Sequence, residues 1–546
     1  MCATYNAWVI LFSIANKLCF VDVFGGIVGD EDQNGLSEVS MPIEEQYRSA
    51  RNRVRRLGHR DSFYVIWAHS QYLQIRDFRF PPEIEVSQRF LALDLPQALI
   101  AEWALEQMAR EVAMHSGPAA QRGASLKQWA TFADIVQRLK DLENDIYGEM
   151  NNPADIHLEL MRISHRQFTW QQQRPTSRWF MRYYKLFNRP EIDTACREVT
   201  GLSVFEVYLI GIALVGIFTA NSRTMERMNI EIPGLDQERI ERFFRFTSLP
   251  LEELRAKLLQ EHALDSSYAY RYSSLREFPL IRIRHCGQRE IACPVPTLLF
   301  WRITSGLYYE LNGRADFRAA FGRSFEEYVG DVPGRRITSE GMNVLGEAEY
   351  NVGRDRKRTI DWIVTQQDAA LLVECKTMRL TWASKAGLTD LTALHGDILK
   401  LAKNVIQVYR TIRDYREGHY PILPFVAERA VFPTVVTLED WYLFGEELPE
   451  RLDTEVKLLM AENALPEAWL DEMPYSVMSV DEFEKATGIM NLVGVHTFIS
   501  RKVRDPQRRK WAYHGYYNHC YRDELMRLPT LFDDDYAQVF NGLAPQ

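Results

Sequence analysis

The chain has few cysteines, and their positions exclude two common uses of this residue. The seven cysteines are odd in number and never occur as a C-x-x-C pair: Cys2, Cys19, Cys196, Cys286, Cys293, Cys375 and Cys520. A disulfide framework and a zinc finger both need closer or paired spacing. A reducing cytoplasm is therefore the expected compartment.

Several signatures of catalysis are also missing. The sequence has no G-x(4)-G-K-[ST], no H-E-x-x-H and no G-x-S-x-G. The first absence excludes the phosphate loop of an ATP-driven motor, and the others exclude a zincin and a hydrolase nucleophile elbow.

An excess of positive charge is absent as well. Lys and Arg number 65 against 74 for Asp and Glu, so the net charge is -9. A hydrophobic fraction of 46% and a charged fraction of 25% are typical of a globular protein. The 546 residues predict two to four domains. A local basic channel is still compatible with this balance, because charge distribution rather than the total decides nucleic-acid binding.

The sequence predicts no membrane span, although two runs are strongly apolar. Residues 8–28 are interrupted by Asn16, Lys17 and Asp22, which favours a core segment over a signal or membrane anchor. Residues 202–222 are apolar nearly all round and lie between polar helices, which predicts a buried central helix.

The order of predicted elements indicates a multidomain fold of α and α/β class. Residues 1–274 are read as a large helical region, because apolar residues recur at three- and four-residue spacing. Residues 275–445 begin with a hairpin that turns at Cys286, then give a helix, three strands, a helix and a strand, an α/β domain. Residues 446–546 form a mainly helical C-terminal region.

Charged residues interrupt two adjacent strands of the predicted α/β domain. "TIDWIV" contains Asp361, and "LLVECK" contains Glu374 and Lys376. Residues i and i+2 of a strand share a face, and the turn "QQD" folds Asp361 back toward Glu374. Two close carboxylates need a cation between them, and Mg²⁺ suits such oxygen ligands. A neighbouring lysine can orient the attacking water or steady a phosphate, so the pattern predicts metal-assisted phosphodiester hydrolysis.

These residues resemble the PD-(D/E)xK, or restriction-endonuclease-like, nuclease superfamily over residues 275–445. A helix with a glutamate, a strand with an aspartate, a strand ending Glu-x-Lys and a further helix carry the resemblance. Ile360 stands where the motif has its proline. The resemblance implies a restriction-endonuclease-like α/β domain that uses Mg²⁺, with Mn²⁺ as a substitute. It implies catalytic or metal-binding roles for Asp361, Glu374, Lys376, the main-chain carbonyl of Cys375, Glu326 (with Glu327 in reserve) and Gln407.

An exposed cross-strand pair is the alternative reading of Glu374 and Lys376. Such a pair contributes under about 1 kcal/mol and carries no chemistry. The preceding "AALLV" argues against it, because strands with one wet face rarely contain a continuous apolar run.

Two basic stretches are candidate nucleic-acid contacts. The first, "RDRKR", supplies Arg354, Arg356, Lys357 and Arg358 just before the Asp361 strand. The second supplies Arg508, Arg509 and Lys510, followed by Trp511, Tyr513, Tyr516 and Tyr517. Basic residues interleaved with aromatic ones suit base stacking on RNA or single strands. A solvated turn beside packed aromatic rings explains the second stretch equally well.

The expected function is therefore a Mg²⁺-dependent endonuclease acting on DNA or RNA, including tRNA. Large accessory regions beside such nucleases are frequent in bacterial antiphage defence, an analogy of architecture alone. The implied partners are nucleic acid, a phage-derived trigger protein and a second copy of the chain. The alternatives are a DNA repair or recombination nuclease with a helicase partner, and a nucleic-acid-binding scaffold with a degenerate nuclease fold.

Overall fold

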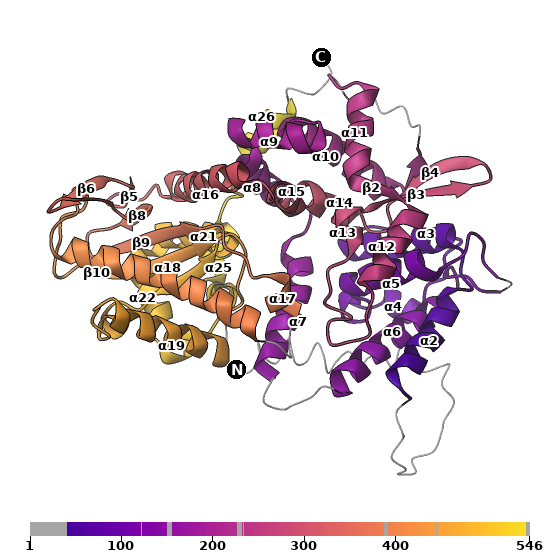
Figure 1. The fold of residues 1–546 in the computed structure, drawn as a ribbon, viewed down its shortest axis with the longest axis horizontal. Coiled ribbons are helices and arrows are strands. Elements are labelled where there is room, and N and C mark those ends of the chain that lie inside the picture. Colours follow the sequence, from indigo (N-terminus) through magenta and orange to yellow (C-terminus); the bar gives the residue numbers. More distant parts are fainter. Residues whose placement is uncertain are drawn as a thin grey trace, which may run out of the picture.

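The computed structural model describes residues 41–541, apart from residues 122, 150–155, 227–231, 233, 387–390 and 444 (Figure 1). The described residues form a multidomain chain of mixed α/β class with several small sheets. The apolar run at residues 8–28, predicted as a core segment, lies outside the described residues.

The region before residue 275 is mostly helical, as the sequence predicts. Its two short strands, β1 (Arg223–Met225) and β2 (Ser248–Pro250), belong to a small sheet described below. Its helices are α2 (Ile43–Val54), α3 (His59–Gln74), α4 (Gln88–Leu91), η1 (Pro96–Ala98), α5 (Glu102–His115), α6 (Trp129–Glu149), α7 (Ile156–Gln172), α8 (Ser177–Phe187), α9 (Pro190–Thr200), α10 (Val204–Ala220), α11 (Gln237–Thr247), α12 (Leu251–Glu261) and α13 (Ser274–Glu277).

The predicted apolar helix is α10, and it packs inside the protein. A capping box starts it, because Ser203 Oγ accepts from the Glu206 N–H while Glu206 accepts from the Ser203 N–H. Gly211 lies against Ile303 of α14 (Pro296–Ile303), and a Cβ on Gly211 would come within 2.7 Å of that side chain. Within the described residues, no single helix has the length and apolar composition of a membrane span. The pair α9 and α10 has them when the two helices are taken together, but the pair is bent by 65°.

A small sheet joins the helical region to the next part of the chain. Its order is β1-β4-β3-β2, with β3 (Leu280–His285) and β4 (Gln288–Ala292) forming the predicted hairpin. Cys286 and Gly287 have φ values of 49° and 77°. Two left-handed residues in a row are what a type I′ turn requires, so this turn fits the twist of the two strands.

A five-stranded mixed sheet forms the centre of the second half of the chain. Its order is β11-β10-β9-β8-β5. The antiparallel part consists of β5 (Asn343–Gly346), β8 (Trp362–Thr365) and β9 (Ala369–Lys376). The parallel part adds β10 (Ala430–Thr437) and β11 (Ser476–Ser479) on the other side of β9.

Helices cover both faces of this sheet. On one face, Leu371 and Val373 pack in a core with residues of α16 (Ala315–Arg336), α21 (Val480–Val493) and α22 (Val495–Val503). On the other face, Ala370 and Leu372 pack with α18 (Thr392–Arg416) and α19 (Glu447–Glu462). Because helices cover both faces of β9, its sequence is a nearly continuous apolar run.

Both sheets continue across the predicted domain boundaries. In the small sheet, β2 pairs in parallel with β3 across the boundary at residues 274 and 275. In the central sheet, β11 comes from the predicted C-terminal region and pairs along its whole length with β10. That region is otherwise helical, as predicted.

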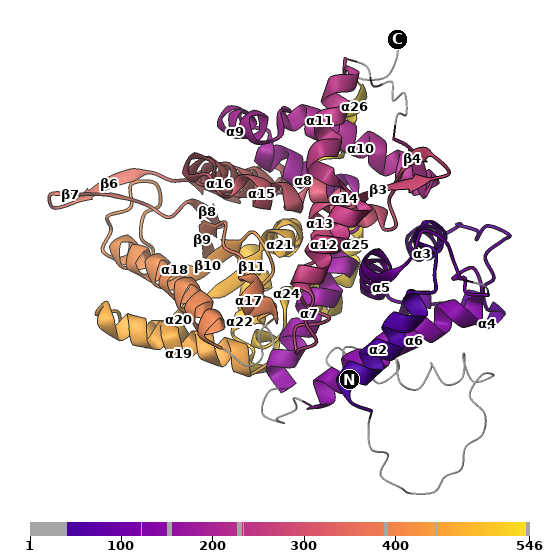
Figure 2. The same cartoon turned by 45° about the vertical axis from the view of Figure 1, so that its right-hand side comes forward.

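A two-stranded hairpin extends away from the central sheet (Figure 2). It consists of β6 (Glu349–Val352) and β7 (Asp355–Arg358), so the basic stretch "RDRKR" forms a strand except for Arg354, which lies in the turn. The remaining helices are α15 (Ser305–Leu311), α17 (Trp382–Ala386), α20 (Trp469–Glu472), α23 (Pro506–Arg509), α24 (Tyr513–Cys520), α25 (Arg522–Arg527) and α26 (Asp533–Asn541).

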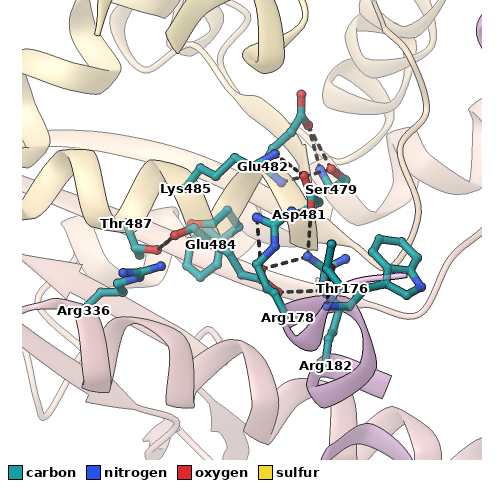
Figure 3. Close-up of polar contacts among 12 residues, drawn as sticks. Thr176, Arg178, Arg182, Arg336, Ser479, Asp481, Glu482, Glu484, Lys485 and Thr487 are labelled. Atoms are coloured by element: carbon teal, nitrogen blue, oxygen red, sulfur yellow. Dashed lines mark hydrogen bonds and ion pairs between the residues drawn. The ribbon is translucent and has the colours of Figure 1, made fainter. Parts of the chain in front are cut away.

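A buried ionic network joins α8 of the helical region to α21 beside the central sheet (Figure 3). Arg182 Nε donates to Glu484 at 2.6 Å, and its Nη2 donates to Asp481 at 2.7 Å. Tyr328 of α16 donates its hydroxyl to Glu484 at 2.7 Å. Arg178 adds an ion pair with Asp481 at 3.0 Å, so three helices meet at two carboxylates.

Candidate functional site

Strand pairing brings Asp361 and Glu374 together, as the sequence predicts. Trp362 is opposite Val373 in the antiparallel register of β8 and β9. Asp361, one residue earlier, is therefore opposite Glu374. The carboxylate of Asp361 accepts a hydrogen bond from the Cys375 N–H at 2.7 Å, which fixes it against the end of β9.

Lys376 lies on the same face of β9 as Glu374. The two side chains form an ion pair, with Lys376 Nζ donating to Glu374 Oε1. Glu374 is only 2% exposed, whereas the Lys376 side chain is 28% exposed. The arrangement places a buried carboxylate behind a cation that still reaches solvent.

Burial and mutual repulsion perturb the ionisation of these groups. Burial, followed by the charge of Asp361, raises the pKa of Glu374 to about 7. Burial also raises the pKa of Asp361. Burial lowers the pKa of Lys376, but the negative charge of Glu374 raises it by more. The pKa of Lys376 is therefore above its usual value. Perturbed groups of this kind are frequent at functional sites.

Glu326 of α16 belongs to the same electrostatic cluster. It is half-buried, and burial together with the charges of Asp361 and Glu347 raises its pKa. Glu327, the reserve candidate, is exposed and pairs instead with Arg189 at 2.8 Å. Of the two glutamates, Glu326 is therefore the one that the fold directs toward Asp361.

One tryptophan links α16 to the strand that follows Asp361. Trp362 Nε1 donates to the main-chain carbonyl of Glu326 at 2.8 Å. The indole fills the space beside Gly330, where an added Cβ would come within 2.0 Å of the ring, and it also contacts Gly346. Because Trp362 follows Asp361 directly, the same residue ties the glutamate helix to the aspartate strand.

Glu347 is a further carboxylate near the site that sequence reasoning missed. It lies between β5 and β6, and burial raises its pKa while Asp361 adds to the effect. Arg358 donates to it at 3.1 Å. The sequence offered one signal, a carboxylate directly after Gly346, the glycine at which β5 ends.

Gln407 does not share a contact with the carboxylates. It is exposed on α18, and no side-chain hydrogen bond joins it to the residues that the structure describes. Asn404, almost one turn earlier, is half-buried and contacts Met378 just beyond β9.

The first basic stretch is partly neutralised by carboxylates. Arg356 pairs with Glu349, Arg358 pairs with Glu347 at 3.1 Å, and Lys357 Nζ lies 2.8 Å from Asp414. Arg354 is exposed at the turn of the hairpin. The exposed edges of Arg356 and Arg358 keep part of this charge available to solvent.

The second basic stretch is arranged similarly. Arg508 pairs with Asp505 at 2.9 Å, Arg509 with Asp453 at 3.3 Å and Lys510 with Glu446 at 2.6 Å. The tyrosines that follow do not offer a stacking surface, because Tyr513, Tyr516 and Tyr517 are all buried. The packed aromatic cluster, one of the two readings of this stretch, is the one that the structure supports.

The carboxylates of the candidate site are possible ligands for a metal ion. In the described part of the chain, no group of three or more His, Cys, Asp or Glu side chains is placed to hold one. Asp361 and Glu374 nevertheless provide two adjacent carboxylates, with the main-chain carbonyl of Cys375 between Glu374 and Lys376. Mg²⁺ is bound through one or two carboxylates completed by water and substrate phosphate, so this set fits Mg²⁺.

The Cys375 thiol is a poor nucleophile. It points to the face of β9 opposite Glu374, and burial raises its pKa well above the usual value.

Comparison of the chain with protein-family models, curated proteins and solved structures finds no match in any of the three.

Proposed function

We propose that the protein is a metal-dependent nuclease that hydrolyses phosphodiester bonds of DNA or RNA. The observation that carries this proposal is the meeting of Asp361, Glu374 and Lys376 at the end of the β8–β9 pair. A structural ion pair would need only one carboxylate for Lys376, whereas this site places a second, half-buried carboxylate, Asp361, opposite the buried Glu374.

The surrounding topology supports the proposal. Three antiparallel strands lead into a parallel strand through α18, and α16 brings Glu326 to the same end of the sheet. We base the proposed restriction-endonuclease-like arrangement on this order of elements. The exposed basic hairpin beside the site has the charge to contact a phosphate backbone.

The proposed roles follow from burial and charge. Asp361, Glu374 and the main-chain carbonyl of Cys375 would hold Mg²⁺, and Glu326 would complete their surroundings. The metal, when bound, supplies charge neutralisation at the scissile phosphate. Lys376 is held by Glu374 and reaches solvent, so it can steady the phosphate and orient the attacking water.

Cleavage assays test this proposal. Purified protein with Mg²⁺ is incubated with plasmid DNA, single-stranded DNA and total tRNA, with and without phage lysate. Glu374→Ala and Lys376→Ala are expected to abolish cleavage, while Glu327→Ala serves as a matched control that leaves it intact. Equal cutting by wild type and both site variants would falsify the assignment, provided that circular dichroism shows all variants folded.

Control of this activity by the helical region and a role in antiphage defence belong to the same proposal. The support for control is the buried network that joins α8 to α21 beside the sheet. The role in defence rests on the analogy of architecture alone. Retained cleavage that starts only from free DNA ends would favour the repair nuclease instead. Nucleic-acid binding without cleavage, unchanged in Glu374→Ala, would favour the scaffold.

A further inference from the structure

A cavity of about 40 Å³ lies between α5 and α7 of the helical region, the segment that follows α12, and α17. Six of the residues that line it carry a positive charge, whereas Glu106 is the single carboxylate among the described lining residues. The six cations are Arg110, Arg162, Arg166, Arg271, Arg276 and Lys385. Such an excess inside a protein is costly unless anions compensate for it.

Carboxylates in and behind the cavity wall hold the cations in place. Arg276 forms a two-pronged pair with Glu106 at 2.6 and 2.7 Å, and Lys385 lies 2.6 Å from Glu439. Arg162 lies 2.8 Å from Glu159. A guanidinium has five N–H donors, so one carboxylate leaves others for a second anion. The cations are therefore fixed in position before a ligand arrives.

Two buried nitrogen atoms beside the cavity lack acceptors. Arg162 is 1% exposed, and its Nε has no hydrogen-bond partner among the described residues. His165 Nε2, on the same face of α7, also has none within that part of the chain. Unsatisfied buried polar groups are rare in native proteins. Their presence on a cationic wall indicates a place for acceptor oxygens.

A second cavity of about 110 Å³ adjoins the first and has aromatic walls. The two share His165, Arg276, Trp382 and Lys385 as lining residues. The Trp382 ring lies edge-to-face with Tyr272, with ring centres 5.4 Å apart. The Arg276 guanidinium lies 5.3 Å from the Trp301 ring and 5.7 Å from the Trp382 ring, at the junction of the two cavities.

We propose that these adjoining cavities form one binding site for a small organic phosphate, the junction site. Its phosphate oxygens bind the arginines of the first cavity, because planar guanidinium groups match phosphate with paired hydrogen bonds. Its flat ring lies between the aromatic residues of the second cavity. A nucleoside monophosphate has this combination of groups. Binding at this site does not depend on the proposed nuclease activity.

The location of the junction site connects the two halves of the protein. His165 and Arg162 belong to α7, whereas Trp382 and Lys385 belong to α17, which packs against α7 (Figures 1 and 2). The α17 helix begins six residues after Lys376 of the candidate site. A ligand held from both sides therefore fixes the segment that leaves β9.

Titration calorimetry and thermal unfolding of the full chain test the proposal. The probes are AMP, inorganic phosphate and adenosine. AMP is expected to bind and to raise the unfolding temperature, with an affinity at least about tenfold higher than that of either fragment, because both cavities contribute. No binding of AMP at millimolar concentration overturns the proposal. Equal affinity for adenosine overturns the phosphate contact, and equal affinity for inorganic phosphate overturns the ring contact.

Substitutions locate the binding. Arg276→Gln is expected to weaken AMP binding about 10- to 100-fold, since it removes a charged contact at the junction. Trp382→Ala should weaken AMP binding and leave phosphate binding unchanged, a result that a merely destabilised variant would not give. The matched control is Arg314→Gln, at a half-exposed arginine that pairs with Asp316 at 2.7 Å and with Glu198. Unchanged AMP affinity in both site variants rejects the junction site.

Discussion

Arg182 Nε donates to Glu484 Oε1 at 2.6 Å, and both side chains are only 1% exposed. Removing one partner leaves an uncompensated buried charge, which typically costs about 3–5 kcal/mol. Arg182→Met should therefore lower the free energy of unfolding by about that amount, because Glu484 loses its closest cation and Asp481 keeps only Arg178 and Lys485. Urea denaturation measures it. Lys457→Met, from an exposed pair at 3.6 Å, should change stability by less than about 1 kcal/mol. Similar losses in the two variants would contradict the role of the buried network.

Gly330→Ala should be destabilising, although alanine is the better helix former. The new Cβ would come within 2.0 Å of Trp362, so either the indole or α16 must move. Overpacking of this kind costs about 1–3 kcal/mol. Gly322→Ala and Gly334→Ala in the same helix meet nothing within 4 Å and should stabilise the protein by up to about 1 kcal/mol. The thermal unfolding temperatures of the three variants provide the comparison, and a stable Gly330→Ala would show that Trp362 does not fix α16.

Burial of Lys502 is expected to make the free energy of unfolding depend on pH. The lysine is 4% exposed, donates to the Arg509 carbonyl at 3.0 Å, and burial lowers its pKa from 10.5 to about 7. Between these values the unfolded chain binds a proton that the folded chain does not, so this residue makes stability rise with pH across that window. Below about pH 7 the lysine is charged in the folded chain as well, so the full cost of burying this charge lowers the stability there.

Lys502→Met should consequently stabilise the protein most at low pH. The penalty corresponds to about 5 kcal/mol, of which about 1 kcal/mol is offset by the lost hydrogen bond. Urea denaturation at about pH 6.5 and about pH 9.5 should show a gain at the lower pH that shrinks at the higher pH. A gain of equal size at both values would indicate that packing rather than charge accounts for it.

Glu326 and Glu327 offer a test of which glutamate serves the candidate site. Glu326→Gln should lower Mg²⁺-dependent cleavage about 10- to 100-fold, as expected for a group that supports a metal site. Glu327→Gln should leave cleavage unchanged, because that side chain is exposed and pairs with Arg189. Glu347→Gln should have an intermediate effect through the charge near Asp361. Initial rates at saturating substrate and several Mg²⁺ concentrations separate these outcomes.

The local elements were predictable because their signals lie close together in the sequence. The β8–β9 hairpin follows from two apolar runs joined by a short polar turn, and its register places Asp361 opposite Glu374. The β3–β4 turn at Cys286 and Gly287 was predictable for the same reason. In such hairpins the pattern of nearby residues sets which side chains meet.

Relationships between distant segments were not predictable in this way. Lys357 pairs with Asp414, which is 57 residues later in the sequence. Lys510 pairs with Glu446, which is 64 residues earlier. Their charge appeared free for nucleic acid only because these partners have no local signal. The pairing of β11 with β10 was missed because a four-residue strand between helices resembles a helix start. The junction site likewise combines residues from segments more than 200 positions apart.

The pairing of β11 also has a consequence for the synthesis of the chain. Residues 476–479 leave the ribosome long after the strands that carry Asp361 and Glu374, and until then β10 has an unpaired edge. Open edges of apolar strands are sites of aggregation. A nascent or prematurely terminated chain that ends before residue 476 therefore carries the candidate carboxylates on an unfinished sheet. Completion of the sheet therefore waits until residues 476–479 have been made, which delays assembly of the site well beyond synthesis of the strands that carry it.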